Sequence, residues 1–347
     1  MIVLMLMTLS VLITFSPNVA AASTTWTSDA DFTAPGAGGS TPVFTGTEVV
    51  GTGTPARVDI VKDNTDWVNK NPSTSPGVRE GPGMTFASSS NVFVLFGGYS
   101  TRDLDDTWEY NLTANTWTKI TTSPRPAGRE WPGLSYDPGQ NVVVLFGGVN
   151  GTNGFLSDTW EFNVAAGTWS QQSPPTSPPP LVDYPLVYYA SQSRHVVFGQ
   201  DIVSGQMQTW AYNAAAHTWA NRTPSGSPSV RSGFAMTYHA ARDRVVLFGG
   251  AFFMTLLAET WEYNWVSNAW GQVFPSGSPA ARAGHSMTYR PVGSVAYLFG
   301  GQTSSGQSQE TWAYSAAGAW TSVGTNTHPP PRQYAGFADD TTHDVAI

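Results

Sequence analysis

The stretch VVVLFGGVNGTNGFLSDTWEFNVAAGTW, residues 142 to 169, decides the fold that the sequence predicts. It places an apolar run, a Gly pair and two Trp residues within a short span. A close copy, VFVLFGGYSTRDLDDTWEYNLTANTW, occupies residues 92 to 117, and another begins near residue 245. A unit that recurs at a fixed period is the signature of a repeat architecture.

Three markers keep a common phase along the chain. The Gly pairs follow one another at steps of 50, 52, 50 and 51 residues, and the third pair is degenerate, with Gln200 after Gly199. The intact pairs are Gly97-Gly98, Gly147-Gly148, Gly249-Gly250 and Gly300-Gly301. The first Trp of each unit is Trp108, Trp160, Trp210, Trp261 or Trp312. The second Trp is Trp117, Trp169, Trp219, Trp270 or Trp320. Markers that stay in phase over five units predict one structural element per unit.

Each unit predicts four strands, separated by Gly, Pro, Asn and Asp. The second strand, for example VVVLFGG, is apolar at consecutive positions, which is typical of a strand covered on both faces. A lone four-stranded sheet cannot bury both faces, so copies of the sheet stack around an axis. We therefore expect an all-β propeller in which the Gly pairs allow close backbone approach and the Trp residues are wedges between blades.

The order of the markers also resembles a known family. A Gly pair that ends a buried strand, followed by a Trp further on, at a period near 50 residues, resembles the kelch repeat, as in the central domain of the galactose oxidase family. The match covers roughly residues 79 to 320. The resemblance implies a kelch-type β-propeller and leaves function open, because such propellers include enzymes and binding modules. The copper radical site of that oxidase family depends on a Cys, and the chain has none, so that activity is not expected.

The repeat divides the chain into blades. Full blades are expected at residues 79–128, 129–180, 181–230, 231–281 and 282–331. Fragments at 56–78 and 332–347 resemble the second and first halves of a unit, so we expect them to form a sixth blade in which N-terminal and C-terminal strands close the ring. The other interpretation is a ring left incomplete, since Ile347 falls where a Gly pair would follow. Residues 23–55 form a lead segment rich in Gly, Thr and Ser, which matches no blade.

Residues 1–22 are interpreted as a signal peptide. They begin with the apolar run MIVLMLMTLSVLITF and end with small residues suited to cleavage before Ser23. No Lys or Arg precedes the run, so an uncleaved anchor is the other interpretation. No later segment has about 20 consecutive apolar residues, so we expect no membrane insertion of the mature chain and a secreted or cell-surface location.

Composition excludes several classes of function. The net charge is -8 and the basic residues form no cluster, which argues against nucleic acid. The absence of Cys excludes thiol catalysis and thiolate metal sites. The six His residues have no ligand-like spacing, and the acids of RDLDD, residues 102–106, lack the order of a calcium loop. We therefore name no catalytic residue, no metal ligand and no cofactor.

Arginines recur at one phase of the opening strands, where the sequence predicts one end of the propeller. They are Arg79, Arg129, Arg231, Arg282 and Arg332, with Leu181 as the exception. The residues before each TW pair are Asp106, Asp158, Glu259 and Glu310, with Gln208 in the unit of Leu181. The one full unit that lacks the Arg also lacks the acid, which favours an ion pair within each blade. The other interpretation is that two or more of these arginines bind a ligand. Arg332 is the freest in that second case, because its partner position is Ala56.

One loop at the same end differs from the others. The segment AFFMTLLAE, residues 251–259, is almost wholly apolar, whereas the corresponding loops are polar. Its Phe252, Phe253, Leu256 and Leu257 are candidates for a recognition patch if the loop is exposed. The alternative is that the loop folds back over the channel mouth or the lead segment.

Three functions remain open. The first is a secreted binding or scaffolding propeller that recognises a protein or glycan through its loop faces. The second is an enzyme acting on a sugar or small molecule at the channel mouth, as kelch-type epimerases and lyases do, which needs unpaired ionisable residues there. The third is a structural module of an envelope or matrix.

Overall fold

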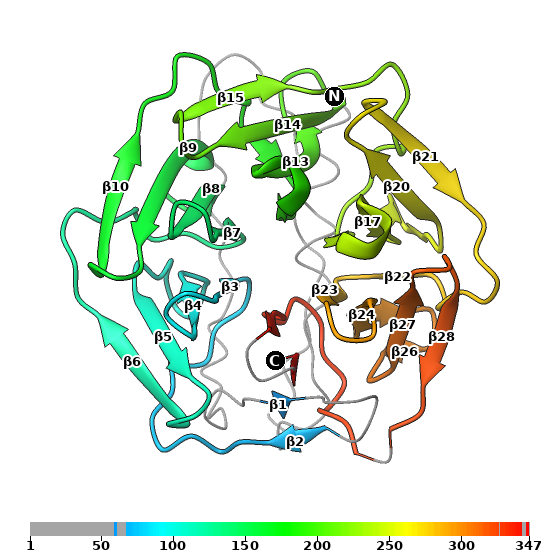
Figure 1. Cartoon of the computed structure of the whole chain (residues 1–347), viewed down its shortest axis with the longest axis horizontal. Coiled ribbons are helices and arrows are strands. Elements are labelled where there is room, and N and C mark those ends of the chain that lie inside the picture. The colour runs from blue at the N-terminus through cyan, green and yellow to red at the C-terminus, as the bar shows by residue number, and fades with distance from the viewer. Residues whose placement is uncertain (1–58, 61–66, 326, 342–344, 347) are drawn as a thin grey trace, which may run out of the picture.

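The computed structural model describes residues 59–60, 67–325, 327–341 and 345–346. In this part of the chain the only helices are two single 3-10 turns, η1 (Ala190–Gln192) and η2 (Ala240–Arg242). The remaining elements are antiparallel strands arranged in sheets around a central axis (Figure 1). The predicted signal peptide (1–22) and lead segment (23–55) lie outside the described residues.

Successive units of the repeat form successive blades. The first blade contains β3 (Gly83–Ala87), β4 (Val92–Phe96), β5 (Thr107–Asn111) and β6 (Thr116–Ile120). The second contains β7 (Gly133–Asp137), β8 (Val142–Asn150), β9 (Gly154–Asn163) and β10 (Thr168–Gln172). The third contains β11 (Leu181–Val182), β12 (Leu186–Tyr189), β13 (Arg194–Asp201), β14 (Met207–Asn213) and β15 (Thr218–Asn221). The innermost strand of each blade lines the axis.

The fourth and fifth blades carry extra short strands at one end. The fourth contains β16 (Ala235–His239), β17 (Arg244–Phe248), β20 (Thr260–Asn264) and β21 (Ala269–Val273), with a hairpin of β18 (Ala251–Phe252) and β19 (Thr255–Leu256). The fifth contains β23 (Ser286–Arg290), β24 (Val295–Phe299), β27 (Thr311–Ser315) and β28 (Trp320–Val323). Its extra strands are β22 (Arg282–Ala283), β25 (Gln302–Thr303) and β26 (Gly306–Gln307).

Both ends of the chain fill the sixth sector, between β6 and β28 (Figure 1). The N-terminal side supplies the hairpin of β1 (Asp59–Ile60) and β2 (Val68–Asn69). The C-terminal side supplies the hairpin of β29 (Asp339–Asp340) and β30 (Val345–Ala346). Because β29 contacts both β3 and β23, the sixth sector joins the first blade to the fifth. The predicted all-β propeller is confirmed, and segments from both sides of the chain occupy its sixth sector. In the described residues they form two separate hairpins, so the predicted pairing of N-terminal with C-terminal strands in one sheet is not observed.

The second Trp of each unit is buried, and in the second to fifth blades it is hydrogen-bonded to the preceding blade. Its indole N–H donates to the Thr hydroxyl that opens the third main strand of the previous blade, at 2.9 to 3.0 Å. The pairs are Trp169 with Thr107, Trp219 with Thr159, Trp270 with Thr209 and Trp320 with Thr260. In the closing blade Trp67 donates to Thr311 at 3.0 Å, across 244 positions of sequence. The same bond therefore joins the closing blade to the fifth blade, whereas the indole N–H of Trp117, at the interface of the first blade with the closing blade, has no partner among the described residues.

The first Trp of each unit has a different role from the predicted wedge. Trp160 is buried, but Trp108, Trp210, Trp261 and Trp312 are half-buried. Each indole N–H donates to the side chain two residues earlier, for example Trp108 to Asp106 at 2.7 Å. The prediction that both Trp residues are inter-blade wedges is therefore right for the second and only partly right for the first.

The Gly pairs behave as their sequence position predicts. Gly97 and Gly98 have φ values of 71° and 95°, in the left-handed region that favours glycine. A Cβ atom on Gly97 would lie 2.5 Å from the carbonyl oxygen of Arg129 in the next blade. Gly98 donates its amide to the same carbonyl at 2.8 Å, and a Cβ atom on Gly249 or Gly300 would lie similarly close to the carbonyl oxygens of Arg282 and Arg332 in the next blade.

Ring closure through Trp67 predicts a specific loss of stability. Trp67→Ala should lower the free energy of unfolding by about 3–5 kcal/mol, because a buried ring and its hydrogen bond are lost. Trp169→Ala, which removes the equivalent bond between contiguous blades, should have an effect of similar size in urea denaturation. A neutral Trp67→Ala beside a destabilising Trp169→Ala would contradict closure by the N-terminal hairpin, and Val68→Ala at an exposed neighbouring position is the control.

Candidate functional site

The arginines at the start of the blades are held in ion pairs within their own blades. Arg79 pairs with Asp106 at 2.6 Å, Arg129 with Asp158 at 2.5 Å, Arg231 with Glu259 at 2.6 Å and Arg282 with Glu310 at 2.5 Å. Each guanidinium also donates to the carbonyl oxygen of the first Gly of its Gly pair, at 2.8 to 3.1 Å. The predicted pairing is therefore confirmed in four blades.

Three of the paired acids, Asp106, Glu259 and Glu310, have a pKa below the usual value, as ion pairing predicts. Burial works to raise the pKa of Asp106, but hydrogen bonds from Arg79 and Trp108 outweigh it and hold that pKa below its usual value. The same balance lowers the pKa of Glu259 and Glu310. The carboxylates are thus charged at neutral pH and neutralise the arginines. Ligand binding by several of these arginines stays a prediction, and buried guanidinium groups with most donors engaged give it little support.

The third blade lacks the arginine and contacts the Gly pair of the second blade through the side chain of Tyr184. Leu181 is fully buried, and the hydroxyl of Tyr184 donates to the carbonyl of Phe146 and accepts the amide of Gly148. In that blade Gln208 hydrogen-bonds Asp201 and Trp210. Strand β13 continues through Gln200, which pairs with Val182, so the blade is locally altered as its degenerate Gly pair predicts.

Arg332 repeats part of the pattern in the closing blade. Its Nε donates to the carbonyl of Pro330 at 3.2 Å, as the other arginines do to the carbonyl two residues earlier. Its expected partner position, Ala56, lies outside the described residues. The prediction that Arg332 meets a ligand is therefore not tested.

The central channel opens at a rim of six residues that share one backbone conformation. Each lies two positions after the arginine phase and has φ between 51° and 69°: Gly81, Trp131, Asp183, Gly233, Gly284 and Tyr334. Backbone amides join neighbours, since Trp131 donates to Gly81 and Tyr334 donates to Gly284, at 2.7 and 2.8 Å. Left-handed backbone at a Trp, an Asp and a Tyr costs about 1–3 kcal/mol each, and such residues gather at functional sites.

Below the rim lies a cavity of about 580 Å³. Inner strands of the blades line it, with apolar side chains that include Met84, Leu134, Met236 and Met287. Trp131, Asp183 and Tyr334 also line it, at the rim. A cavity of this size with few polar groups is suited to a small molecule or a single inserted side chain.

Carboxylates gather on the rim of the first three blades. Burial and the nearby charges of Glu80 and Asp103 raise the pKa of Glu130 to about 7. Water reaches Asp183, but the surrounding protein disfavours its charged form and raises its pKa to about 6, against a hydrogen bond from the Gly233 amide. Glu130, Glu80 and Asp103 repel one another, so this part of the mouth favours positive charge.

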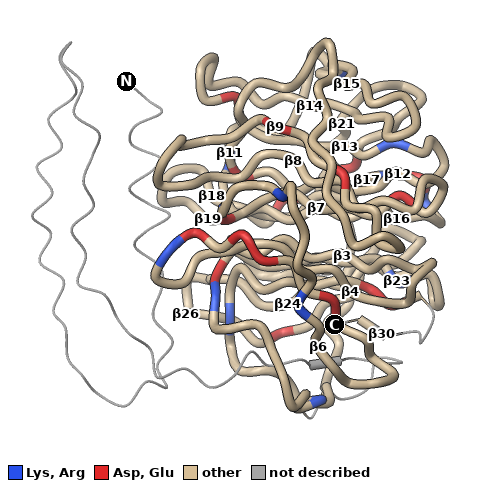
Figure 2. The backbone as a smooth tube through the Cα atoms, turned by 90° about the vertical axis from the view of Figure 1, so that its left-hand side faces the viewer, with Lys and Arg blue, Asp and Glu red and all other residues tan. Residues whose placement is uncertain are grey.

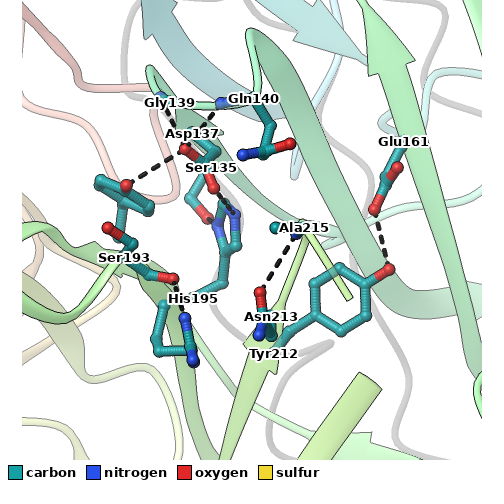
Figure 3. Close-up of polar contacts among 12 residues, drawn as sticks. Ser135, Asp137, Gly139, Gln140, Glu161, Ser193, His195, Tyr212, Asn213 and Ala215 are labelled. Carbon is teal, nitrogen blue, oxygen red and sulfur yellow. Dashed lines mark hydrogen bonds and ion pairs between the residues drawn. The ribbon is translucent and has the colours of Figure 1, made fainter. Parts of the chain in front are cut away.

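A Ser–His–Asp cluster in the described residues is buried between the second and third blades (Figure 3). The Ser135 hydroxyl and His195 Nδ1 form a 2.5 Å hydrogen bond, whereas His195 Nε2 lies 3.8 Å from Asp137. Burial lowers the pKa of His195 to about 3, so the imidazole is neutral. Asp137 accepts hydrogen bonds from the Gly139 amide and the Tyr188 hydroxyl. Ser135 is buried and the base–carboxylate bond of a hydrolytic triad is absent, so the cluster joins blades.

The apolar loop forms the hairpin β18–β19 and stands at the face of the propeller that also carries β11 and β26 (Figure 2). Phe252, Phe253 and Met254 are exposed, at 43%, 37% and 84%, and the two phenyl rings pack edge to face at 4.6 Å. Leu256 and Leu257 are half-buried. The structure therefore favours the exposed patch over a loop folded onto the channel, and its role in recognition stays a prediction.

The fold and the rim together define a six-sectored β-propeller with a channel mouth and an exposed loop face. The family model described as the KLHDC2/KLHL20/DRC7 Kelch-repeats domain matches residues 43–250 and 191–341. These ranges cover most of the chain, so the chain belongs to the kelch-repeat family, whose propellers typically bind proteins. No curated protein matches the chain. In the described residues no helix is long and apolar enough to cross a membrane.

The rim was missed by sequence reasoning. The position two residues after each arginine holds Gly three times among its six members, which is the available signal for left-handed backbone. The backbone conformation at this position is the same in all six sectors, whereas the side chain is absent in three and is Trp, Asp or Tyr in the others. No sequence signal marks the acids Glu80, Asp103 and Glu130, because they approach one another only when the blades pack together.

The Arg129–Asp158 pair predicts an asymmetry between single and double substitutions. Asp158→Ala should cost about 3 kcal/mol in the free energy of unfolding, because it leaves a buried guanidinium without its carboxylate. The double change Arg129→Leu with Asp158→Gln, which copies the third blade, should cost less than the single change. Denaturation curves of both variants measure this, and a neutral Asp158→Ala would contradict the structural role of the pair.

Glu130 predicts a pH dependence of stability. Its pKa is above the usual value in the folded protein, so folded molecules hold the proton longer and stability falls as pH rises from about 4.5 to about 7. Glu130→Gln should therefore gain about 1–2 kcal/mol relative to the parent at pH 8 and little at pH 4, allowing for solvent screening. Urea melts at the two pH values check this, with Asp105→Asn as control, and an equal effect at both would be inconsistent with a raised pKa.

Proposed function

We propose that the chain is an exported protein-binding propeller that recognises its partner through the face carrying the channel mouth and the hairpin β18–β19. The observation that carries this proposal is the exposed cluster of Phe252, Phe253 and Met254. Large apolar side chains at the tip of an ordered hairpin are costly to leave in water and are enriched at recognition sites. Export rests on the apolar run of residues 1–22.

The hairpin favours a protein over a glycan as partner. A protein surface offers apolar pockets for two phenyl rings and a methionine, and Met and aromatic residues are enriched at the cores of protein interfaces. A purely structural module needs no exposed hairpin of this kind. Recognition of a glycan has no comparable observation in its favour on this face.

Catalysis is the second candidate, because the rim meets one of its conditions. Pairs of acids near neutral pKa suit proton transfer, and Glu130 and Asp183 are raised to about 7 and about 6. The described histidines His195 and His285 are buried with pKa values lowered to about 3, so they do not supply a base at the mouth. An enzyme would lose turnover on Asp183→Asn while substrate binding persists, and a binding protein shows no turnover to lose.

Site-specific photo-crosslinking tests the binding face. A photoreactive phenylalanine at Phe253 should capture one defined protein in the native cells or medium, whereas the same group at Val292 should not. Val292 is also exposed, and it lies between β23 and β24 at the opposite face. The double variant Phe252→Ala and Phe253→Ala should keep its unfolding midpoint and lose the captured partner. Equal capture from both positions would contradict a dedicated binding face.

A further inference from the structure

The two aromatic side chains of the channel rim converge. Trp131 lies against the backbone of Gly81, where a Cβ atom would be 2.4 Å from its ring. Tyr334 lies over Gly284, and its hydroxyl approaches Gly233. The ring centroids of Trp131 and Tyr334 are 6.3 Å apart, although the residues come from the second and sixth blades. The glycines on the rim thus make room for two rings that meet over the channel.

Asp183 is the third rim residue of this group, and it meets the Tyr334 hydroxyl at Gly233. Its carboxylate accepts a hydrogen bond from the Gly233 amide, beside which the Tyr334 hydroxyl lies. Burial, and then the charges of Asp183 and Glu80, raise the pKa of the Tyr334 hydroxyl. An aromatic pair flanked by carboxylates is the arrangement that binds organic cations, since ring faces and carboxylates both attract positive charge.

The positive charges of this face do not balance the rim acids. Arg79, Arg129, Arg231 and Arg282 are taken by the acids of their own blades, and Arg125 pairs with Asp105. Arg102 is exposed on the loop between β4 and β5, and Arg332 precedes Tyr334 by two residues. Even so, the charges that act on Glu130 are those of Glu80 and Asp103, which both raise its pKa. A cation entering the mouth relieves this repulsion.

We propose that the channel mouth binds a single cationic group, a Lys or Arg side chain of the protein partner, between Trp131, Tyr334 and Asp183. The proposal rests on the proposed function in taking the cation from a protein. The charged end of such a side chain lies beside the rings and the Asp183 carboxylate, and its apolar stem extends outward from the mouth to the partner's backbone. The hairpin β18–β19 then contacts the surface around the inserted residue.

Short fluorescent peptides test the charge preference without knowledge of the partner. The probes are one hexapeptide with Lys, Arg, norleucine or acetyl-lysine at its centre, measured by fluorescence anisotropy against the full chain. We expect the Lys and Arg peptides to bind at least about tenfold more tightly than the norleucine and acetyl-lysine peptides. The same measurements with tetramethylammonium as competitor distinguish a side chain from a free organic cation.

Two variants separate the rim from general electrostatic attraction. Asp183→Asn should remove most of the preference for Lys, whereas Asp105→Asn, which removes the same charge from an exposed pair on this face, should keep it. Trp131→Gly restores the residue found at Gly81, Gly233 and Gly284, so it should fold with unchanged or higher stability and still lose binding.

Each outcome decides the proposal. Equal binding of the Lys and norleucine peptides, or equal losses in Asp183→Asn and Asp105→Asn, would overturn the cation site. Displacement of the Lys peptide by tetramethylammonium at the peptide's own Kd would overturn the side chain as the source of the cation. Failure of the cation site leaves capture of a partner at Phe253 unaffected, whereas failure of the proposed function abolishes that capture and leaves the peptide preference unaffected.

Discussion

The structure depends on a buried hydrogen bond from the indole N–H of the second Trp of a blade to a Thr hydroxyl of the blade before it, which the described residues make at every blade interface except the one between the first and the closing blade. The bond recurs from Trp169 to Trp320 and again at Trp67, which lies near the other end of the chain. A ring of sheets can slide or open unless each interface has a fixed register. The Trp indole fills the space between two blades, and its single N–H, bonded to one buried Thr hydroxyl, fixes their register.

A second set of contacts determines what the ring leaves for binding. Arg79, Arg129, Arg231 and Arg282 are each held by an acid and by the first carbonyl of their Gly pair. The carbonyls of Arg129 and Arg282 also accept the Gly-pair amide of the preceding blade. This arrangement uses four arginines of the mouth for architecture, while in the part of the chain that the structure describes no ion pair is formed by Glu80, Glu130 or Asp183. The charge preference of the mouth therefore follows from the architecture, and the left-handed rim then decides which side chains face the channel.

The fold and the ion pairs follow from the sequence because they repeat within one chain. In one unit Leu181 replaces the Arg and Gln208 replaces the acid, and this joint replacement indicates the ion pair from the sequence alone. The half-buried first Trp residues and the rim were not predicted, because they depend on how blades lie against one another. Trp131 and Tyr334 are 203 positions apart and meet only when the sixth sector is closed. The predicted signal peptide, the lead segment and the first residues of the 56–78 fragment fall outside the described residues.

The most direct test of this account is the titration of the Asp183 carboxyl carbon by NMR, in the free protein and with the Lys hexapeptide bound. The account predicts a pKa near 6 in the free protein, because channel walls disfavour the charge, and a fall well below that value when the cation binds. A free-protein pKa at the ordinary value of an aspartate, unchanged by the peptide, would contradict both the raised pKa of Asp183 and the cation site.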